Sequence, residues 1–402
     1  MIALERAFEI LDRTLAGGRL PVETAPVRRA LGRVLACDQT ARLDQPPFDR
    51  SSMDGYAIAA NDTRESYRLI GTVMAGKAPT QCLVPGTAIK VMTGAPTPAG
   101  TGRVVMREYA EERDGIVTIH RHDGPVNIRF RGEDLRAGDV VARAGAVLDA
   151  HRIANLVACG VTDVAVAHAP RIAIFSTGDE IVDDPAEIAC DPARLAPGKI
   201  MDSNGPMLAA LCQGRGFAVV SQAALPDDKD AIAAALRAAF DQADIVILSG
   251  GVSVGESDFV LDALSVVGLT PRFTRLAIKP GKPTVFASAG DKIAFALPGN
   301  PVAVFLTFHL FVLRAVAIIS GGAPAMREFR LRLARDFEQS DAERLNFIPC
   351  RLNERAEIVP LEFHGSAHLA ALSDADGFFI APIGCKRIEA GGEAAFVRWD
   401  EM

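Results

Sequence analysis

The stretch ILSGGVSVGESD, residues 247–258, decides the fold of this chain, because an apolar run ends there in glycines and acids. Residues 244–249, DIVILS, are short, apolar and rich in β-branched side chains, which is typical of a strand buried on both faces of a parallel sheet. In such sheets ligands bind beyond the carboxyl ends of the strands, where glycines let backbone N–H groups approach an anion. Glu256 and Asp258 would repel a phosphate unless a cation such as Mg²⁺ joined them to it. Taken alone, the stretch is equally consistent with a solvated loop.

Short apolar strands alternate with helical segments through residues 171–321, which predicts a doubly wound parallel α/β domain. Polar or glycine-bearing turns follow the strands at FSTGDE (175–180), LPDD (225–228), SGGVSVGESD (249–258) and LPGNP (297–301). Because the carboxyl ends of parallel strands meet at one edge of the sheet, we expect these turns to line one crevice. The segment LAIKPGKP (276–283) adds Lys279 and Lys282, whose ammonium groups suit a phosphoanhydride or another oxyanion bound with a metal.

The remainder of the chain is organised differently. The first residues form an amphipathic helix in which Leu4, Phe8, Leu11 and Leu15 share one side. The predicted parts outside the α/β domain are a helix followed by loop (1–45), a small β-rich unit (46–127), a turn-rich segment with a helix (128–170) and a small β-barrel (322–402).

Bulk properties exclude several classes of protein. The formal net charge is -7, which argues against nucleic-acid binding through a basic surface. The seven cysteines are scattered, odd in number and free of any CxxC pair, which favours reduced thiols in a cytoplasmic protein. The apolar run 302–319 is long enough to suggest a membrane span, but it carries His309 and Arg314 and follows Pro301. We therefore expect a buried core helix there, and no membrane partner.

The motifs together resemble the molybdopterin molybdenumtransferase family, or molybdenum insertases, to which the gephyrin E-domain belongs. FSTGDE, SGGVSVGESD and LPGNP are accompanied by AIKPGKP (277–283), PPFDRSSMDGYA (46–57) and VMTGAP (91–96). The resemblance covers nearly the whole chain. It implies a multidomain α/β protein with a helical linker domain (1–45 and 128–170), an inserted β-rich lid (46–127), a molybdopterin-binding α/β domain (171–321) and a C-terminal β-barrel (322–402).

The resemblance also implies a reaction. Members of the family take adenylylated molybdopterin and molybdate, release AMP in the presence of Mg²⁺ and leave molybdenum on the dithiolene sulfurs. The expected assembly is a homodimer whose crevice is shared between the α/β domain of one chain and the lid of the other. Transient contacts with the upstream adenylyltransferase and with recipient molybdoenzymes are expected as well.

Roles for individual crevice residues follow from the same resemblance. Asp227 and Asp258 are expected near the phosphoanhydride or its metal, with Glu180 as an essential acid nearby, so these three are the candidate metal ligands. Lys279 and Lys282 resemble oxyanion ligands for molybdate. The other residues expected to contact molybdopterin or the oxyanion are Ser249, Gly250, Gly251, Ser253, Gly255, Pro298, Gly299, Asn300, Pro301, Arg351 and Ser366.

Three residues outside the α/β domain match the family as well. Asp54 and Thr93, in the lid, match positions that the family uses across the dimer, and Asp134 is a further match. An Asp-Gly pair such as the one at Asp54 is also a common turn, so a purely structural role for Asp54 stays open.

Two positions depart from the family pattern. Ala303 stands where the family commonly has serine, and Pro349 stands where it has the second arginine of a motif in the barrel; both missing side chains are expected molybdate contacts. Arg344 and Arg351 remain nearby in the sequence. Proline lacks a backbone donor, so we expect the strand at position 349 to be bulged or at an edge. Besides a competent insertase, the sequence leaves open a paralogue that binds molybdopterin or its nucleotide without efficient metal insertion. A scaffold in the manner of gephyrin is a weaker alternative, because no long linker is evident.

Overall fold

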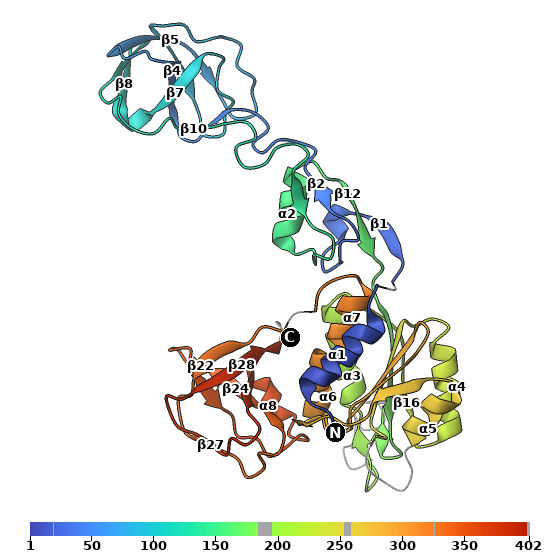
Figure 1. The fold of residues 1–402 in the computed structure, drawn as a ribbon. Coiled ribbons are helices and arrows are strands. Elements are labelled where there is room, and N and C mark those ends of the chain that lie inside the picture. Colours follow the sequence, from blue (N-terminus) through green and yellow to red (C-terminus); the bar gives the residue numbers. More distant parts are fainter. Residues whose placement is uncertain (19, 184–194, 253–258, 325, 400–402) are drawn as a thin grey trace.

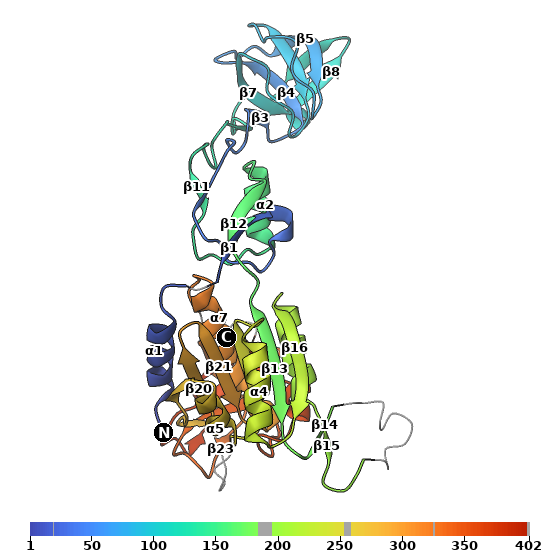
Figure 2. The same cartoon turned by 90° about the vertical axis from the view of Figure 1, so that its right-hand side faces the viewer.

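The computed structural model describes residues 1–18, 20–183, 195–252, 259–324 and 326–399. The molecule is elongated: the lid, a slender linker unit and the α/β domain follow one another along its long axis (Figure 1, Figure 2). The C-terminal domain lies beside the α/β domain (Figure 1). The lid and the α/β domain therefore lie at opposite ends of the folded molecule.

The α/β domain is built on a six-stranded sheet of order β16-β13-β17-β21-β20-β18. Its strands are β13 (Arg171–Thr177), β16 (Ala218–Leu225), β17 (Ile245–Ser249), β18 (Thr270–Phe273), β20 (Val285–Ala289) and β21 (Lys292–Leu297). The first four strands of the order run parallel, whereas β20 is antiparallel to both β21 and β18. The prediction of a parallel sheet is therefore wrong at this edge, and the sheet is mixed. The cause is the short turn at Gly290 and Asp291, which joins β20 to β21 as a hairpin, whereas parallel strands would need a long crossover.

Helices cover both faces of this sheet. The helices are α1 (Leu4–Leu15), α3 (Asn204–Gly214), α4 (Lys229–Ala239), α5 (Phe259–Val266), α6 (Pro301–Thr307) and α7 (Leu313–Ile319). On one face, Ile172 and Ile174 of β13 pack in a core with α1, α3, α6 and α7. On the other face, Ala173 and Phe175 pack in a core with α4 and α5. Burial on both faces explains why the strands are continuously apolar in sequence. A separate short pair, β14 (Ile181–Val182) with β15 (Ile200–Met201), follows β13.

The N-terminal helix α1 is amphipathic, as predicted. Leu4, Leu11 and Leu15 are buried, and Phe8 packs partly buried against the same core. That core also contains residues of α3, α6 and α7, so α1 belongs to the α/β domain in space and lies between the sheet and the C-terminal domain (Figure 1).

The long apolar helix is a core helix, as predicted. Pro301 occupies its first turn, and 72% of its most apolar window is buried inside the protein. The helix is not regular, because a π-helical turn (Phe308–Val312) separates α6 from α7. Side chains from this helix contact both the mixed sheet and the C-terminal domain, which fixes the two relative to each other.

The linker unit is formed by two segments of the chain and contains more strand pairing than helix. Its elements are β1 (Val22–Pro26), a 3-10 turn (Val27–Arg29), β2 (Gln39–Thr40), β11 (Val140–Ala142), α2 (Ala150–Ala158) and β12 (Asp163–Ala167). β1 pairs antiparallel with β12, and β2 pairs antiparallel with β11. Although Leu35, Leu148 and Leu156 give this unit its own apolar core, a helical linker domain is not confirmed.

The lid is a six-stranded sheet of order β7-β4-β6-β5-β9-β8. Its elements are β4 (Gly55–Ala59), β5 (Ser66–Val73), β6 (Thr87–Val91), β7 (Thr101–Met106), a 3-10 turn (Arg107–Tyr109), β8 (Ala110–Arg113) and β9 (Ile116–Ile119). A short pair, β3 (Arg50–Ser51) with β10 (Ile128–Arg129), closes its base toward the linker unit. The lid has two apolar clusters of its own and so folds around its own core.

The C-terminal domain is an antiparallel sheet of order β19-β24-β26-β28-β22 with β25 beside β24. Its elements are β19 (Ile278–Lys279), β22 (Phe329–Arg332), β23 (Phe337–Glu338), β24 (Leu345–Leu352), β25 (Ile358–Pro360), α8 (Ala370–Ser373), β26 (Gly377–Ala381), β27 (Arg387–Ile388) and β28 (Glu393–Arg398). Exceptionally, β19 joins β24 in parallel and comes from the α/β segment of the chain. In the part of the chain that the structure describes, the strand order ends at β19 and β22, so a closed barrel is not confirmed.

Candidate functional site

A cleft of about 560 Å³ opens where the strand-end turns of the α/β domain meet the C-terminal domain. Most of the crevice residues predicted from the sequence line it: Glu180, Gly250, Gly251, Lys279, Lys282, Pro298, Gly299, Asn300 and Ser366. Ser253, Gly255 and Asp258 lie outside the described residues. The structure thus brings together residues that are nearly 190 positions apart in the sequence, as expected for turns at one edge of a sheet.

The glycines at the end of β17 are required by the backbone. Gly250 and Gly251 have φ values of 100° and 65°, in the left-handed region that only glycine adopts without strain. A Cβ atom on Gly250 would lie 2.3 Å from the carbonyl oxygen of Thr177, and one on Gly251 would lie 2.6 Å from Val260 Cγ2. The chain therefore passes this edge of the sheet with bare backbone facing the cleft.

Asn204, which was not among the predicted site residues, ties two of the cleft turns together. Its buried side chain donates from Nδ2 to Ser249 Oγ at 2.8 Å and to the carbonyl oxygen of Gly299 at 2.7 Å. The N-terminus of α3 is capped by Asp202, whose Oδ1 accepts from the N–H groups of Asn204 and Gly205 at 3.0 Å each. With that carboxylate as the cap, the amide of Asn204 is free to position the turns. Its place at the start of a helix was the only signal in the sequence.

Glu180 lines the cleft, and its charge acts on Asp227, which is not among the lining residues. Burial raises the pKa of Asp227, a hydrogen bond from the backbone of Asp179 opposes this rise, and the nearby charges of Asp179 and Glu180 add to it. The N–H of Asp227 itself donates to Asp179 Oδ1 at 3.2 Å. Asp227 Oδ1 is buried without a hydrogen-bond partner. Within the described ranges no three His, Cys, Asp or Glu side chains are grouped closely enough to hold a metal by themselves.

The cationic side is formed by Lys279, Lys282 and Arg344. Arg344 Nη2 donates to Asp341 Oδ2 at 2.6 Å, and Lys279 Nζ lies 3.5 Å from the same oxygen. In the sequence, Arg344 stood out only as a neighbour of Pro349, which departs from the family pattern, and no pattern pointed to Asp341. These three cations line the same cleft as Glu180, so its lining carries charges of both signs. We call the three cations the cationic wall, and Glu180 with the neighbouring Asp227 the acidic wall.

The LPGNP turn links the two domains at the cleft. Asn300 Nδ2 donates to Ser366 Oγ at 2.7 Å, and the N–H of Val302 donates to the carbonyl oxygen of Ser366 at 3.0 Å. Pro301 is the first residue of α6, where its missing N–H costs nothing. Ala303, two residues after Pro301, also lines the cleft, and its methyl side chain offers no hydrogen-bonding group there.

Arg351 lies away from the cleft. It is exposed on β24, opposite Val359 of β25, and does not contribute to the lining. Pro349 pairs with Phe378 of β26 with no shift in register, so the predicted bulge is absent here. The carbonyl oxygen of Pro349 accepts from Leu361 on the opposite side, where neither β19 nor β25 pairs with residue 349. In a strand the N and C=O of one residue point the same way, so Pro349 needs no donor toward β26.

The two lid residues are in direct contact. Asp54 Oδ1 accepts from the Thr93 N–H at 2.7 Å and from Thr93 Oγ1 at 2.8 Å, and these hydrogen bonds lower the pKa of Asp54. Asp134, at the base of the lid, forms an ion pair with Arg129. The linker unit separates the lid from the α/β domain of its own chain (Figure 1).

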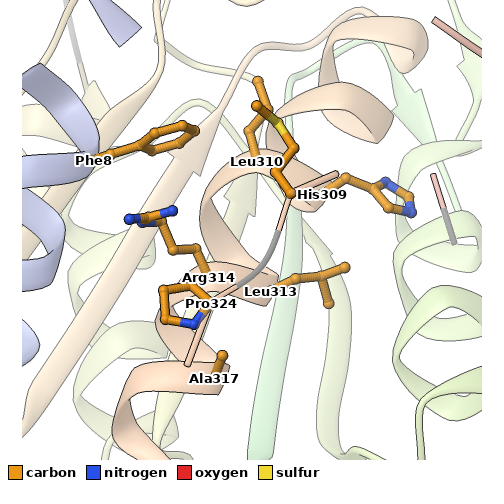
Figure 3. A pocket seen from close by; sticks show the side chains of 8 residues that line it. Phe8, His309, Leu310, Leu313, Arg314, Ala317 and Pro324 are labelled. Carbon is orange, nitrogen blue, oxygen red and sulfur yellow. The ribbon is translucent and has the colours of Figure 1, made fainter. Parts of the chain in front are cut away.

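A smaller cavity of about 80 Å³ lies between α1 and the long apolar helix at its π-helical turn. Arg314 forms two hydrogen bonds with Asp12 of α1, at 2.7 and 2.5 Å, and its guanidinium lies 4.3 Å from the ring centre of Phe8. Figure 3 shows Arg314 and Phe8 on one side of this cavity and His309 on the other. Burial lowers the pKa of His309 to about 3, so this histidine is neutral. We assign this cavity to the packing of α1.

Comparisons with known proteins cover the whole length of the chain. Three family models match: "MoeA N-terminal region (domain I and II)" at residues 2–160, "Probable molybdopterin binding domain" at 173–317 and "MoeA C-terminal region (domain IV)" at 330–399. A molybdopterin molybdenumtransferase of Staphylococcus aureus is 32% identical over 384 residues, which cover 92% of this chain and 90% of that protein. Its counterpart in Staphylococcus epidermidis is 32% identical over 373 residues, covering 90% and 87%.

A solved structure agrees with these relatives. The molybdopterin biosynthesis moeA protein of Pyrococcus horikoshii superimposes with a TM-score of 0.83 at 30% identity, over 99% of this chain and 100% of that one. The cleft, the matching models and the full-length relatives lead to one conclusion: this chain belongs to the MoeA family of molybdopterin molybdenumtransferases, enzymes of molybdenum cofactor biosynthesis.

Proposed function

We propose that the cleft between the α/β and C-terminal domains inserts molybdenum from molybdate into adenylylated molybdopterin, with Mg²⁺-dependent release of AMP. One observation carries this proposal: a bare glycine turn, an acidic wall and a cationic wall meet in one cleft. A phosphoanhydride needs backbone donors and a cation, and a tetrahedral dianion needs several positive donors. The two walls supply these separately.

The cationic wall is the proposed molybdate site. Lys279, Lys282 and Arg344 line it, and Arg344 offers a planar set of N–H groups that a lysine lacks. Arg344 therefore supplies the arginine contact to molybdate that Pro349 cannot make. Asn300 and Ser366 add polar groups beside these cations.

The acidic wall fits a divalent cation. Asp227 has a buried, unpartnered Oδ1 and a raised pKa, both of which a bound cation would relieve. We propose that Asp227 and Glu180 hold Mg²⁺ together with Asp258, which lies outside the described residues. When bound, Mg²⁺ neutralises charge on the phosphoanhydride oxygens. Ser249, Gly250 and Gly251 orient the substrate through their backbone groups, with Asn204 holding that turn in place.

The remaining expectations belong to the same proposal. We propose a homodimer in which Asp54 and Thr93 of one lid complete the cleft of the partner subunit. A cytoplasmic location and transient contacts with the adenylyltransferase and recipient molybdoenzymes rest on the family resemblance. The described cysteines are free, which is compatible with a reducing compartment.

The test is AMP release from adenylylated molybdopterin, measured with molybdate and Mg²⁺ present or withheld. The wild type should need both, and Lys282→Ala should require a higher molybdate concentration. Lys292→Ala is the matched control, because it removes an exposed lysine at the start of β21, away from the cleft. Binding of the nucleotide without AMP release under any condition would favour the paralogue that binds but does not insert metal, and would refute the insertase proposal.

A further inference from the structure

One carboxylate holds two of the three cations of the proposed oxyanion site. Asp341 Oδ2 accepts from Arg344 Nη2 at 2.6 Å and lies 3.5 Å from Lys279 Nζ, while Asp341 Oδ1 accepts from the N–H of Glu343 at 3.1 Å. Among the described residues, Lys282 has no such partner. The Arg344 hydrogen bond is the largest of the causes that lower the pKa of Asp341.

The strand pairing of β19 with β24 explains this arrangement. Lys279 lies opposite Asn346, and the N–H of Leu345 donates to the carbonyl oxygen of Ala277 at 3.0 Å. Residue 344, just before β24, is thereby placed next to Lys279 from a different domain. Asp341 precedes Arg344 by three residues and so reaches both side chains.

We propose that Asp341 is an internal counter-ion that sets the affinity and the charge selectivity of the oxyanion site. This inference rests on the proposed function, because it concerns the same cations. Asp341 occupies one N–H of Arg344 and part of the Lys279 charge, so an incoming oxyanion competes with it for these donors. At the same time its fixed negative charge repels the oxyanion, and it repels a dianion twice as strongly as a monoanion of the same size.

The expected size of the effect follows from Coulomb's law. A dianion held on the far side of the two cations would lie roughly 6–12 Å from Asp341, where the repulsion in a water-like medium changes affinity roughly threefold to tenfold. For a monoanion at the same place the exponent is halved, so the change is the square root of that for the dianion, roughly twofold to threefold. Salt should reduce both effects.

Equilibrium binding of molybdate and of perrhenate, a tetrahedral monoanion of similar size, tests the proposal on the full chain. Asp341→Asn should bind molybdate roughly threefold to tenfold more tightly than the wild type, and perrhenate by about the square root of that factor. Asp341→Ser, which also removes the charge, should behave alike, and thermal unfolding should show that both variants are folded. Glu343→Gln is the matched control, because it removes an exposed charge of the same loop that makes no ion pair with Lys279 or Arg344.

Each contrary result has a distinct meaning. Unchanged or weaker molybdate binding by both Asp341 variants would overturn the counter-ion role. Equal factors for the two anions, or the same gain in Glu343→Gln, would overturn it as well, because neither follows from a local charge. If Lys282→Ala binds molybdate as tightly as the wild type does, the oxyanion site itself is refuted, and with it this part of the proposed function.

Discussion

The cleft and the Asp54–Thr93 pair of the lid are built in two different ways. The cleft is assembled within one chain, from turns of the α/β domain and from the C-terminal domain that packs against it. The Asp54–Thr93 pair is also held by two hydrogen bonds, but it belongs to the lid, which lies at the opposite end of the molecule from the α/β domain (Figure 1).

This difference indicates what each region needs in order to act. Lys279, Lys282 and Arg344 line the cleft of a single chain, so we expect that cleft to attract small anions without a second copy. Asp54 belongs to the lid, which the linker unit separates from the α/β domain, so we do not expect a cation of its own chain's cleft to be its partner in catalysis. A second copy that brings its lid over the cleft would supply that partner, and the predictions below test this contrast.

The largest expected effect concerns the sharing of sites between two chains. Asp54→Ala removes the acceptor that holds Thr93, and Lys282→Ala removes a cation of the cleft; each should lower AMP release roughly a hundredfold, the typical cost of losing one positioned group. Mixed in equal amounts and allowed to exchange subunits, the two variants should regain about a quarter of wild-type activity. Half of the dimers are then mixed, and each mixed dimer has one intact cleft of two.

The complementation needs a control for subunit exchange and for damage to the lid. Glu111→Gln changes an exposed acid on β8 of the same lid and should leave activity unchanged, since that residue is only weakly paired with His120. If mixed dimers are detected by mass and activity does not return, the lid and the cleft act within one chain, and the contrast drawn above is wrong.

A smaller effect separates the two arginines of the C-terminal domain. Arg344 lines the cleft, whereas Arg351 is exposed on β24 away from it. Arg344→Ala should raise the molybdate concentration needed for half-maximal turnover about tenfold to a hundredfold, the value of one charge-assisted hydrogen bond at about 1.5–3 kcal/mol. Arg351→Ala should leave it unchanged. A shift in the Arg351 variant alone would show that β24 presents the opposite face to the substrate.

The sequence predicted those parts of the site that depend on local pattern. Apolar strands that end in glycine turns placed Gly250, Gly251 and the LPGNP turn correctly at one edge, because the carboxyl ends of parallel strands converge there. The spacing of apolar residues in α1 and the polar residues inside the long apolar helix correctly predicted that both helices pack against the core. These features are properties of short segments, which a single sequence displays directly.

The features that the sequence did not predict depend on which segments pair in space. Strands β20 and β21 form a hairpin because the turn between them is short, although the surrounding sequence has the alternating pattern of a parallel α/β domain. Asn204 and Asp341 act on partners more than forty or sixty residues away, and no local rule links them to Ser249 or Lys279. Arg351 was among the expected site residues, but β24 has no bulge at Pro349 that would change which of its side chains face the cleft, and Arg344 lines the cleft instead.

The smallest expected effect concerns the acidic wall and its pH dependence. Burial raises the pKa of Asp227 above its unfolded value, so the folded protein binds more protons than the unfolded chain as the pH rises above about 4. Stability is therefore lost with rising pH through that window. Asp227→Asn removes this loss and should unfold at a higher temperature than the wild type at pH 7, with the difference vanishing toward pH 4.

Metal binding should reverse this advantage, because a cation next to Asp227 compensates its charge. Added Mg²⁺ should raise the unfolding temperature of the wild type toward that of Asp227→Asn and leave the variant nearly unchanged, while the variant loses Mg²⁺-dependent AMP release. Asp291→Asn, an exposed acid in the turn between β20 and β21, should show neither the pH-dependent gain nor the altered Mg²⁺ response. Equal stabilisation of wild type and Asp227→Asn by Mg²⁺ would place the ion elsewhere. The acidic wall would then be a structural strain in this chain, unlike the cationic wall, where Asp341 already forms ion pairs with Lys279 and Arg344.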